Sequence, residues 1–225
     1  MSYRPLLKIC GVTNSYDAQL VSSSGADFCG IVVDVDFSER SLSPWQAKEV
    51  ASASNIPVVI LLGDPEVETA EEIISEIKPY AVQLLWRESP ELVRTLKSRL
   101  SCRIWKTIHL PITPDQALPE NYVEAGADAL VVDSMDTSEG FVRFGGTGKV
   151  ADWKAAAALV EKIPIPIFLA GGINPENVDK ALIQVHPFGI DLCSGIEASK
   201  GKKDPEKVRT LVDNLNTAIK KMKRT

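Results

Sequence analysis

Eight short apolar runs, each followed by a stretch of helical character, extend along the whole chain. The apolar runs cover residues 6–10, 28–33, 57–62, 80–85, 103–108, 128–132, 165–170 and 188–192. The helical stretches lie near 15–24, 44–54, 66–77, 89–100, 114–125, 152–162, 175–184 and 204–222, and several open on the Ser, Asp or Pro residues that begin helices. Strands that are apolar at nearly every position are buried on both faces, so this alternation predicts a parallel sheet covered by helices.

Eight such units in one chain close most economically into a (β/α)₈ TIM barrel. The length of 225 residues suits one such barrel, so we expect an α/β fold with a single domain over 1–225. The alternative is an open, doubly wound sheet, but its edge strands would be more polar than these runs are. In a barrel the active site is expected at the carboxyl ends of the strands.

Composition narrows the classes of partner. The net charge of −5 argues against nucleic acid, and no segment is long and apolar enough to cross a membrane. The four cysteines are far apart in the sequence, with neither the spacing of a metal site nor that of a disulfide framework. We therefore expect a cytoplasmic protein with reduced thiols and no bound metal.

Two residues at strand ends are candidates for acid–base chemistry. Cys10 ends the first run and Asp133 follows the sixth, so a barrel would place both at its mouth. A thiol acts as a base only where positive charge stabilises its thiolate, and Lys8 points to the same side of its strand as Cys10. A buried carboxyl group can hold a proton and act as an acid. The plainer alternatives are an inert buried cysteine and an aspartate that orders its loop.

Glycine-rich turns follow the sixth, seventh and eighth runs. Backbone N–H groups at such turns can approach a phosphate closely, and loops seven and eight of these barrels often do so. The candidate phosphate-binding residues are Gly146, Gly148, Gly171, Gly172, Ser194 and Gly195. The loop over 133–151 is the longest connection, and we expect it to close over a bound substrate.

Several motifs together resemble one known family. They are KICGVTN at 8–14, SGAD at 24–27, Arg40 followed by LSP, VQL at 82–84, VVDS at 131–134, GGTGK at 145–149, LAGGINPENV at 169–178 and DLCSGIEASKGKKD at 191–204. In this order, over nearly the whole length, they resemble phosphoribosylanthranilate isomerase of tryptophan biosynthesis.

The resemblance implies an Amadori rearrangement of N-(5-phosphoribosyl)anthranilate to a carboxyphenylamino-deoxyribulose phosphate, with no cofactor and no metal. Asp133 would protonate the ring oxygen of the sugar, and Cys10 would remove a proton from its second carbon. Arg40 would hold the anthranilate carboxylate, a task suited to its planar fork of donors. Lys8, Gln83 and Asp191 would also contact this small phosphorylated substrate. The oligomeric state is left open between monomer and homodimer.

Two stretches depart from the pattern of the family. The usual VQLHG reads VQLLWRE here, with Leu85 and Trp86 in place of a histidine and a glycine, and VVDVDFSER adds the carboxylates Asp34 and Asp36 before Arg40. Both stretches belong to the anthranilate side of the expected pocket. Two alternatives therefore stay open: a divergent paralogue that isomerises another phosphorylated sugar amine, and a non-catalytic phosphoribosyl-binding protein.

Overall fold

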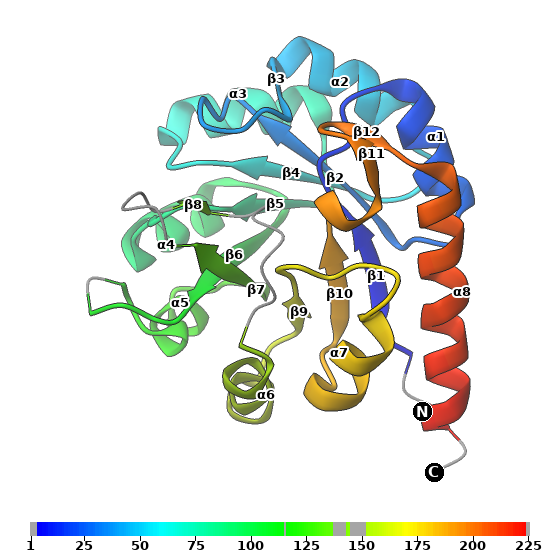
Figure 1. The fold of residues 1–225 in the computed structure, drawn as a ribbon. Helices are drawn as coiled ribbons and strands as arrows, with labels where there is room; N and C mark the ends of the chain where they lie inside the picture. The colour runs from blue at the N-terminus through cyan, green and yellow to red at the C-terminus, as the bar shows by residue number, and fades with distance from the viewer. Residues whose placement is uncertain (1–3, 115, 137–142, 145–151, 224–225) are drawn as a thin grey trace.

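The computed structural model describes residues 4–114, 116–136, 143–144 and 152–223, which form a closed barrel of parallel strands surrounded by helices (Figure 1). The barrel strands are β1 (Leu6–Ile9), β2 (Phe28–Val33), β4 (Val58–Leu62), β5 (Ala81–Leu84), β6 (Arg103–Leu110), β7 (Ala129–Asp136), β9 (Ile167–Leu169) and β10 (Gly189–Leu192). The ring closes because β1 pairs with both β10 and β2. The predicted TIM barrel is confirmed, and the open sheet is excluded.

The helices that cover the barrel are α1 (Ser15–Ser23), α2 (Pro44–Ser52), α3 (Val67–Ile77), α4 (Pro90–Arg99), α5 (Pro119–Glu124), α6 (Trp153–Lys162), α7 (Val178–Val185) and α8 (Pro205–Met222). Short pieces decorate the loops: β3 (Ser41–Leu42), β8 (Arg143–Phe144), the 3₁₀ turn η1 (Ser194–Ile196), β11 (Glu197–Ser199) and β12 (Lys202–Lys203). The helix expected over 114–125 is shorter than predicted, since it begins at Pro119. Among the described residues, no helix has the length and apolar character to span a bilayer.

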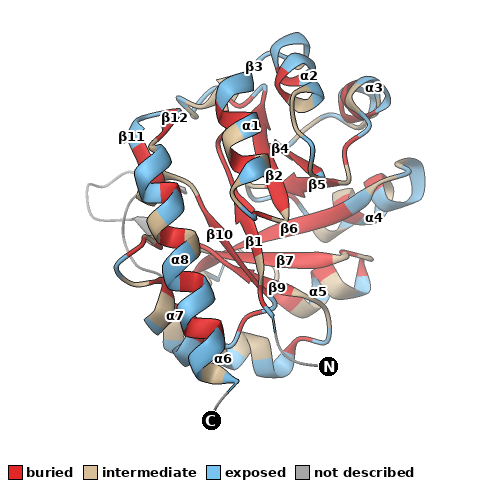
Figure 2. Cartoon of the chain, turned by 90° about the vertical axis from the view of Figure 1, so that its right-hand side faces the viewer, coloured by how far each residue is buried: buried red, intermediate tan, exposed pale blue. Residues whose placement is uncertain are grey.

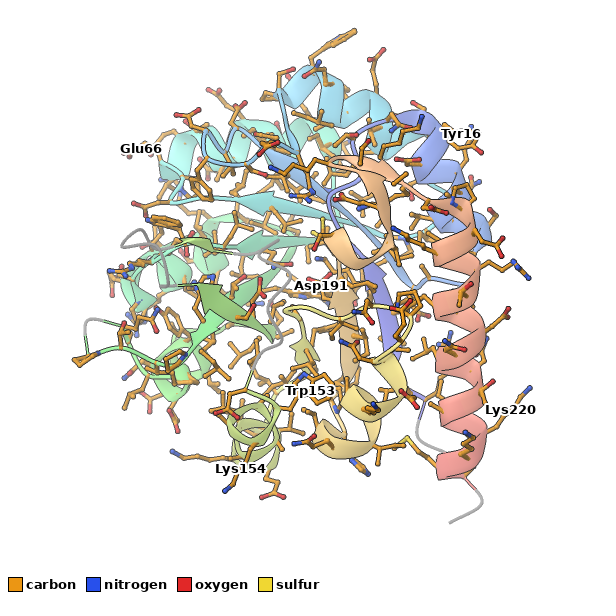
Figure 3. The ribbon with its side chains drawn as sticks, viewed as in Figure 1. Tyr16, Glu66, Trp153, Lys154, Asp191 and Lys220 are labelled. Atoms are coloured by element: carbon orange, nitrogen blue, oxygen red, sulfur yellow. The ribbon has the colours of Figure 1, made fainter. Side chains whose placement is uncertain are left out.

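Alternation along each strand divides the apolar residues between two clusters. The larger cluster lies between strands and helices, and the outer faces of the helices are exposed (Figure 2). The smaller one fills the barrel, where Phe28, Trp105 and Phe168 pack ring against ring. Figure 3 shows Asp191 near the middle of the barrel and Tyr16 and Lys220 on outer helices. Inward-facing side chains at the carboxyl ends of the strands therefore point into the open end of the barrel, where the active site of this fold is found.

Candidate active site

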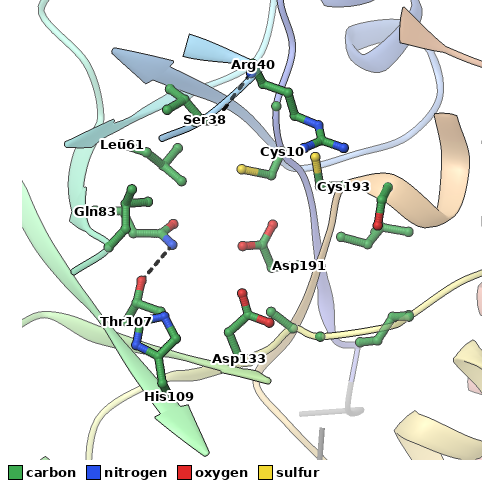
Figure 4. Close-up of a pocket in the computed structure, with 18 of the residues that line it drawn as sticks. Cys10, Ser38, Arg40, Leu61, Gln83, Thr107, His109, Asp133, Asp191 and Cys193 are labelled. Carbon is green, nitrogen blue, oxygen red and sulfur yellow. Dashed lines mark hydrogen bonds between the residues drawn. The ribbon is translucent and has the colours of Figure 1, made fainter. Parts of the chain in front are cut away.

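A cavity of about 590 Å³ opens at the carboxyl ends of the strands. Its lining includes most of the residues that the sequence singled out, from strands far apart in the chain (Figure 4). Those residues are Cys10, Arg40, Gln83, Asp133, Gly171, Gly172, Asp191 and Ser194. A cavity of this size suits a small molecule.

A buried ion pair lies beneath the cavity. Strands β1 and β10 pair with Lys8 opposite Asp191, and the Lys8 Nζ lies 2.8 Å from the Asp191 Oδ2. Burial opposes the charge on Lys8, but Asp191 and Cys10 outweigh it and raise the pKa of the amine. The second oxygen of Asp191, Oδ1, has no hydrogen-bond partner among the described residues. The Asp191 side chain points toward the cavity, and this buried oxygen keeps an unused capacity to accept a hydrogen bond (Figure 4).

Cys10 directly follows β1, with its thiol in the cavity wall (Figure 4). Burial raises the pKa of the thiol, whereas the nearby charges of Lys8 and Lys203 lower it. The thiol is therefore protonated at neutral pH, and added positive charge would favour the thiolate. Room for Cys10 comes from Gly30 on β2, where a Cβ atom would lie 3.0 Å from the Cys10 Sγ and 3.1 Å from the Lys8 Nζ.

Asp133, near the end of β7, has a different environment from Asp191 although both carboxyl groups face the same cavity (Figure 4). Its Oδ1 accepts a hydrogen bond from the Ser134 backbone N–H at 2.7 Å. Burial raises the pKa of Asp133 to about 7, against the lowering effect of that hydrogen bond. A carboxyl group with this pKa carries a proton in much of the neutral range, so it can act as an acid.

Arg40 reaches the cavity from the loop between β2 and β3. Its guanidinium donates to Glu197 at two points, Nε to Oε1 at 2.8 Å and Nη2 to Oε2 at 2.6 Å. Burial alone would raise the pKa of Glu197, but the hydrogen bond from Arg40 and the charge of Lys203 lower it to about 2. Glu197 is therefore ionised throughout the neutral range.

The remaining wall combines apolar and polar side chains. The rings of Phe37 and Trp86 lie 4.6 Å apart between centroids, and Leu61 and Leu85 add aliphatic surface. Gln83 donates to the Thr107 Oγ1 at 3.0 Å. This wall can pack against a flat aromatic group.

The two extra carboxylates of the β2–β3 loop do not line this cavity. Asp34 and Asp36 are exposed, and neither is among the described residues that border it. They therefore add no carboxylate to its wall.

The predicted phosphate-binding residues are divided among three places. Gly171 and Gly172 follow β9 with φ of +82° and +65°, a conformation that glycine adopts without strain, and both border the cavity with Ser194. Gly195 packs tightly behind them, since a Cβ atom there would lie 2.1 Å from the Ile173 carbonyl oxygen. Gly146 and Gly148 lie outside the described residues, as does most of the 133–151 loop.

Comparison with known proteins shows to which family the chain belongs. The family model for N-(5'-phosphoribosyl)anthranilate isomerase matches residues 7–214. The chain belongs to this family. The isomerase of Natronomonas pharaonis is 35% identical over 210 residues, which cover 92% of this chain and 96% of that one. The isomerase of Haloarcula marismortui is 36% identical over 216 residues, covering 94% and 96%.

Solved structures of the family share the fold. The enzyme of Thermotoga maritima has a TM-score of 0.80 at 30% identity, covering 95% of this chain and 99% of that one. Another isomerase structure, in complex with reduced 1-(o-carboxyphenylamino)-1-deoxyribulose 5-phosphate, has a TM-score of 0.77 at 28% identity, covering 95% and 99%. This chain is thus a TIM barrel of an isomerase family of tryptophan biosynthesis.

In this chain of the isomerase family, some residues that line the cavity, or that hold its lining residues in place, were not predicted from the sequence. His109 lines the cavity because β6 extends two residues beyond the predicted 103–108. Burial and the charges of Lys106 and Arg87 lower the pKa of His109 to about 3, so its ring is neutral. Glu197 and Lys203 belong to a motif that the sequence singled out, but no local signal linked either to Arg40.

Proposed function

We propose that the chain isomerises N-(5-phosphoribosyl)anthranilate to 1-(2-carboxyphenylamino)-1-deoxyribulose 5-phosphate, with Asp133 as general acid and Cys10 as general base. The observation that supports this most is that the Asp133 carboxyl group and the Cys10 thiol line one cavity. Ring opening needs a proton donor, and the following step needs a proton acceptor at a second position.

In the first step the Asp133 carboxyl group donates its proton to the ring oxygen of the sugar. The bond between that oxygen and the first carbon breaks, and the nitrogen lone pair forms a protonated imine at that carbon. A pKa of about 7 keeps Asp133 a competent donor at neutral pH. Asp191 forms an ion pair with Lys8, so we assign the acid role to Asp133 and a binding role to Asp191.

In the second step the thiol of Cys10 first loses its proton to solvent at the open cavity, and the resulting thiolate takes the proton from the second carbon and becomes a thiol again. The electron pair of that C–H bond forms a double bond to the first carbon, and the electrons of the imine bond return to nitrogen. The resulting enolamine tautomerises to the ketone. The imine carries a positive charge beside the thiol, which lowers the pKa that burial has raised, so the base becomes active when its substrate is ready.

The two ends of the substrate match two regions of the cavity. The phosphate would bind backbone N–H groups near Gly171, Gly172 and Ser194, and the carboxylate would bind Arg40. The aromatic ring would pack on the wall that Phe37 and Trp86 share.

A direct assay tests the assignment. The wild-type protein should consume the fluorescence of phosphoribosylanthranilate made in situ, and Cys10→Ala and Asp133→Asn should each lower kcat by about 10² to 10⁴. Binding of the reduced product analogue should change little in either variant. Unchanged rates in both variants would contradict the acid–base assignment. An inert wild type that still binds the analogue would favour the non-catalytic alternative, and turnover of another phosphorylated sugar amine would favour the paralogue.

A further inference from the structure

The Arg40 side chain is held in place by residues from the other end of the chain. Glu197, at the start of β11, binds one side of the guanidinium through both carboxylate oxygens. Among the described residues, Arg40 has no other side-chain partner, so Nη1 and the second hydrogen of Nη2 are left for a ligand. These donors form the end edge of the planar fork, which can bind a second carboxylate with two hydrogen bonds.

Glu197 is itself fixed by a buried cation. The Lys203 Nζ donates to the Glu197 Oε1 at 3.1 Å and to the Cys10 carbonyl oxygen at 2.6 Å, and Lys203 is 1% exposed. The Gly201 backbone N–H donates to the same carboxylate oxygen at 3.2 Å. The position of Arg40 is thus tied to the strand end that carries Cys10.

Two further features restrict Arg40. At Gly11 a Cβ atom would lie 2.7 Å from the Arg40 Cδ, so the side chain crosses close over the backbone that follows Cys10. Glu39 forms an ion pair with Lys200, a second link between the β2–β3 loop and the β11–β12 hairpin. Figure 4 shows Arg40 above Cys10 and Cys193, at the rim of the cavity.

The charge balance of this cluster favours an anion. Arg40 and Lys203 contribute two positive charges and Glu197 one negative charge, which leaves one net positive charge on these three residues. Without Lys203, the Arg40–Glu197 pair would be neutral and would attract a carboxylate only weakly. Lys203 therefore allows Glu197 to orient Arg40 without cancelling its attraction for the ligand.

We propose that Glu197, supported by Lys203, is a positioning residue that turns the free edge of Arg40 toward the substrate carboxylate. This rests on the proposed function, because it assumes that the ligand carries a carboxylate on its aromatic ring. Glu197 acts through Arg40 and touches no reacting atom. Its contribution should therefore appear only with ligands that carry this carboxylate.

The test compares two ligands that differ in one group. The Kd of reduced 1-(o-carboxyphenylamino)-1-deoxyribulose 5-phosphate is measured by calorimetry beside that of its counterpart with a plain phenyl ring. In Glu197→Gln the Kd of the first ligand should rise about tenfold or more, and that of the second should stay within twofold. Glu206→Gln removes a carboxylate from an exposed pair on α8 and should change neither value.

Two outcomes would overturn the proposal: equal weakening of both ligands, which a general structural role would produce, and no weakening of either. Glu197→Gln in an Arg40→Ala background gives a second measurement, because a residue that acts through Arg40 should then have no further effect on the carboxylated ligand. A further loss of more than threefold there would also overturn it. If the wild type itself binds both ligands equally, the proposed function has failed at the carboxylate, and the positioning role fails with it.

Discussion

The two carboxyl groups of the cavity differ because of their immediate partners. Asp191 pairs with Lys8 at 2.8 Å, whereas Asp133 is half-buried, accepts a backbone N–H from Ser134 and has no cation at contact distance among the described residues. Burial raises the pKa of Asp133 to about 7. In active sites, two carboxyl groups commonly take different roles because their surroundings differ.

Replacing Asp133 should stabilise the protein in a pH-dependent manner. The unfolded pKa is about 3.9, and the folded pKa is about 7. Between these values the folded state binds a proton that the unfolded state does not, so the free energy of unfolding of the wild type falls as pH rises. Asp133→Asn removes this dependence. Its advantage over the wild type should grow from pH 5 to pH 7, level off above, and reach about 1 to 4 kcal/mol.

Urea unfolding of both proteins across this pH range measures the difference. The variant should show the loss of about 10² to 10⁴ in kcat at every pH, since it lacks the proton donor. A stability difference that stays constant with pH would show that Asp133 is ionised in the folded protein throughout the range.

Breaking the Lys8–Asp191 pair should be costly. Lys8→Met leaves the Asp191 carboxylate buried without its cation, and removal of one partner of a buried pair costs about 3 to 5 kcal/mol. Adding Asp191→Asn removes the unpaired charge and should restore more than half of the loss. The free energy of unfolding of the two single variants and the double variant gives the coupling directly. A loss below about 1 kcal/mol in Lys8→Met would mean that water in the cavity solvates Asp191.

At the scale of elements, the position of Cys10 after β1 depends on a residue without a side chain, Gly30, on the neighbouring strand β2. Gly30 carries no Cβ, and an added one would lie 3.0 Å from both the Cα and the Sγ of Cys10. At that separation the neighbouring atoms must move, and the Cα belongs to the backbone of β1. The glycine therefore sets where the thiol can lie.

We expect Gly30→Ala to displace the thiol and lower kcat by about 10- to 100-fold, because small displacements of reacting groups have effects of that order. Gly63→Ala is the matched control, since its Cβ would meet the nearest side-chain atoms at 3.6 Å, an ordinary contact. Steady-state assays with phosphoribosylanthranilate measure both variants, and circular dichroism checks their folding. Equal rates in Gly30→Ala and the control would show that the position of Cys10 tolerates this shift.

The elements were predictable where a local pattern marks them. The apolar runs identify all eight barrel strands because both faces of each are buried. Strand β6 was predicted too short because polar His109 interrupts its apolar run, although it faces a cavity and not the core. Helix α5 was predicted too long because its N-cap residue is Leu118, which makes no side-chain cap hydrogen bond, so no capping residue marks its start. The pattern of apolar residues indicates which positions are buried in the core. It therefore does not identify strand positions whose polar side chains face a cavity.

At the scale of the whole molecule, contacts between distant parts of the chain were beyond sequence patterns. Arg40 and Glu197 are 157 positions apart, and they meet because closure of the ring through β1 and β10 brings the last loop beside the second. Nothing in the spacing of either residue indicates the other. A resemblance to a family could assign Arg40 a role, but only the closed barrel shows what holds it.

Along the axis of the barrel, the side chains that pack its interior are separate from those that line the cavity. Phe168 is fully buried among aromatic rings inside the barrel, 4.6 Å from Trp105 between centroids, whereas Asp133 and Cys10 border the open cavity. Phe168→Ala should therefore lower the free energy of unfolding by about 3 to 5 kcal/mol through the cavity it creates. Urea unfolding measures this loss, and assays at low temperature, where the variant stays folded, should give kcat within about threefold of the wild type. Asp133→Asn should do the reverse, with stability gained and turnover lost. If Phe168→Ala lowered kcat as far as Asp133→Asn does, the interior packing and the mouth would have to be one cooperative unit, because a site held only by its own strand ends would not respond to a void below it.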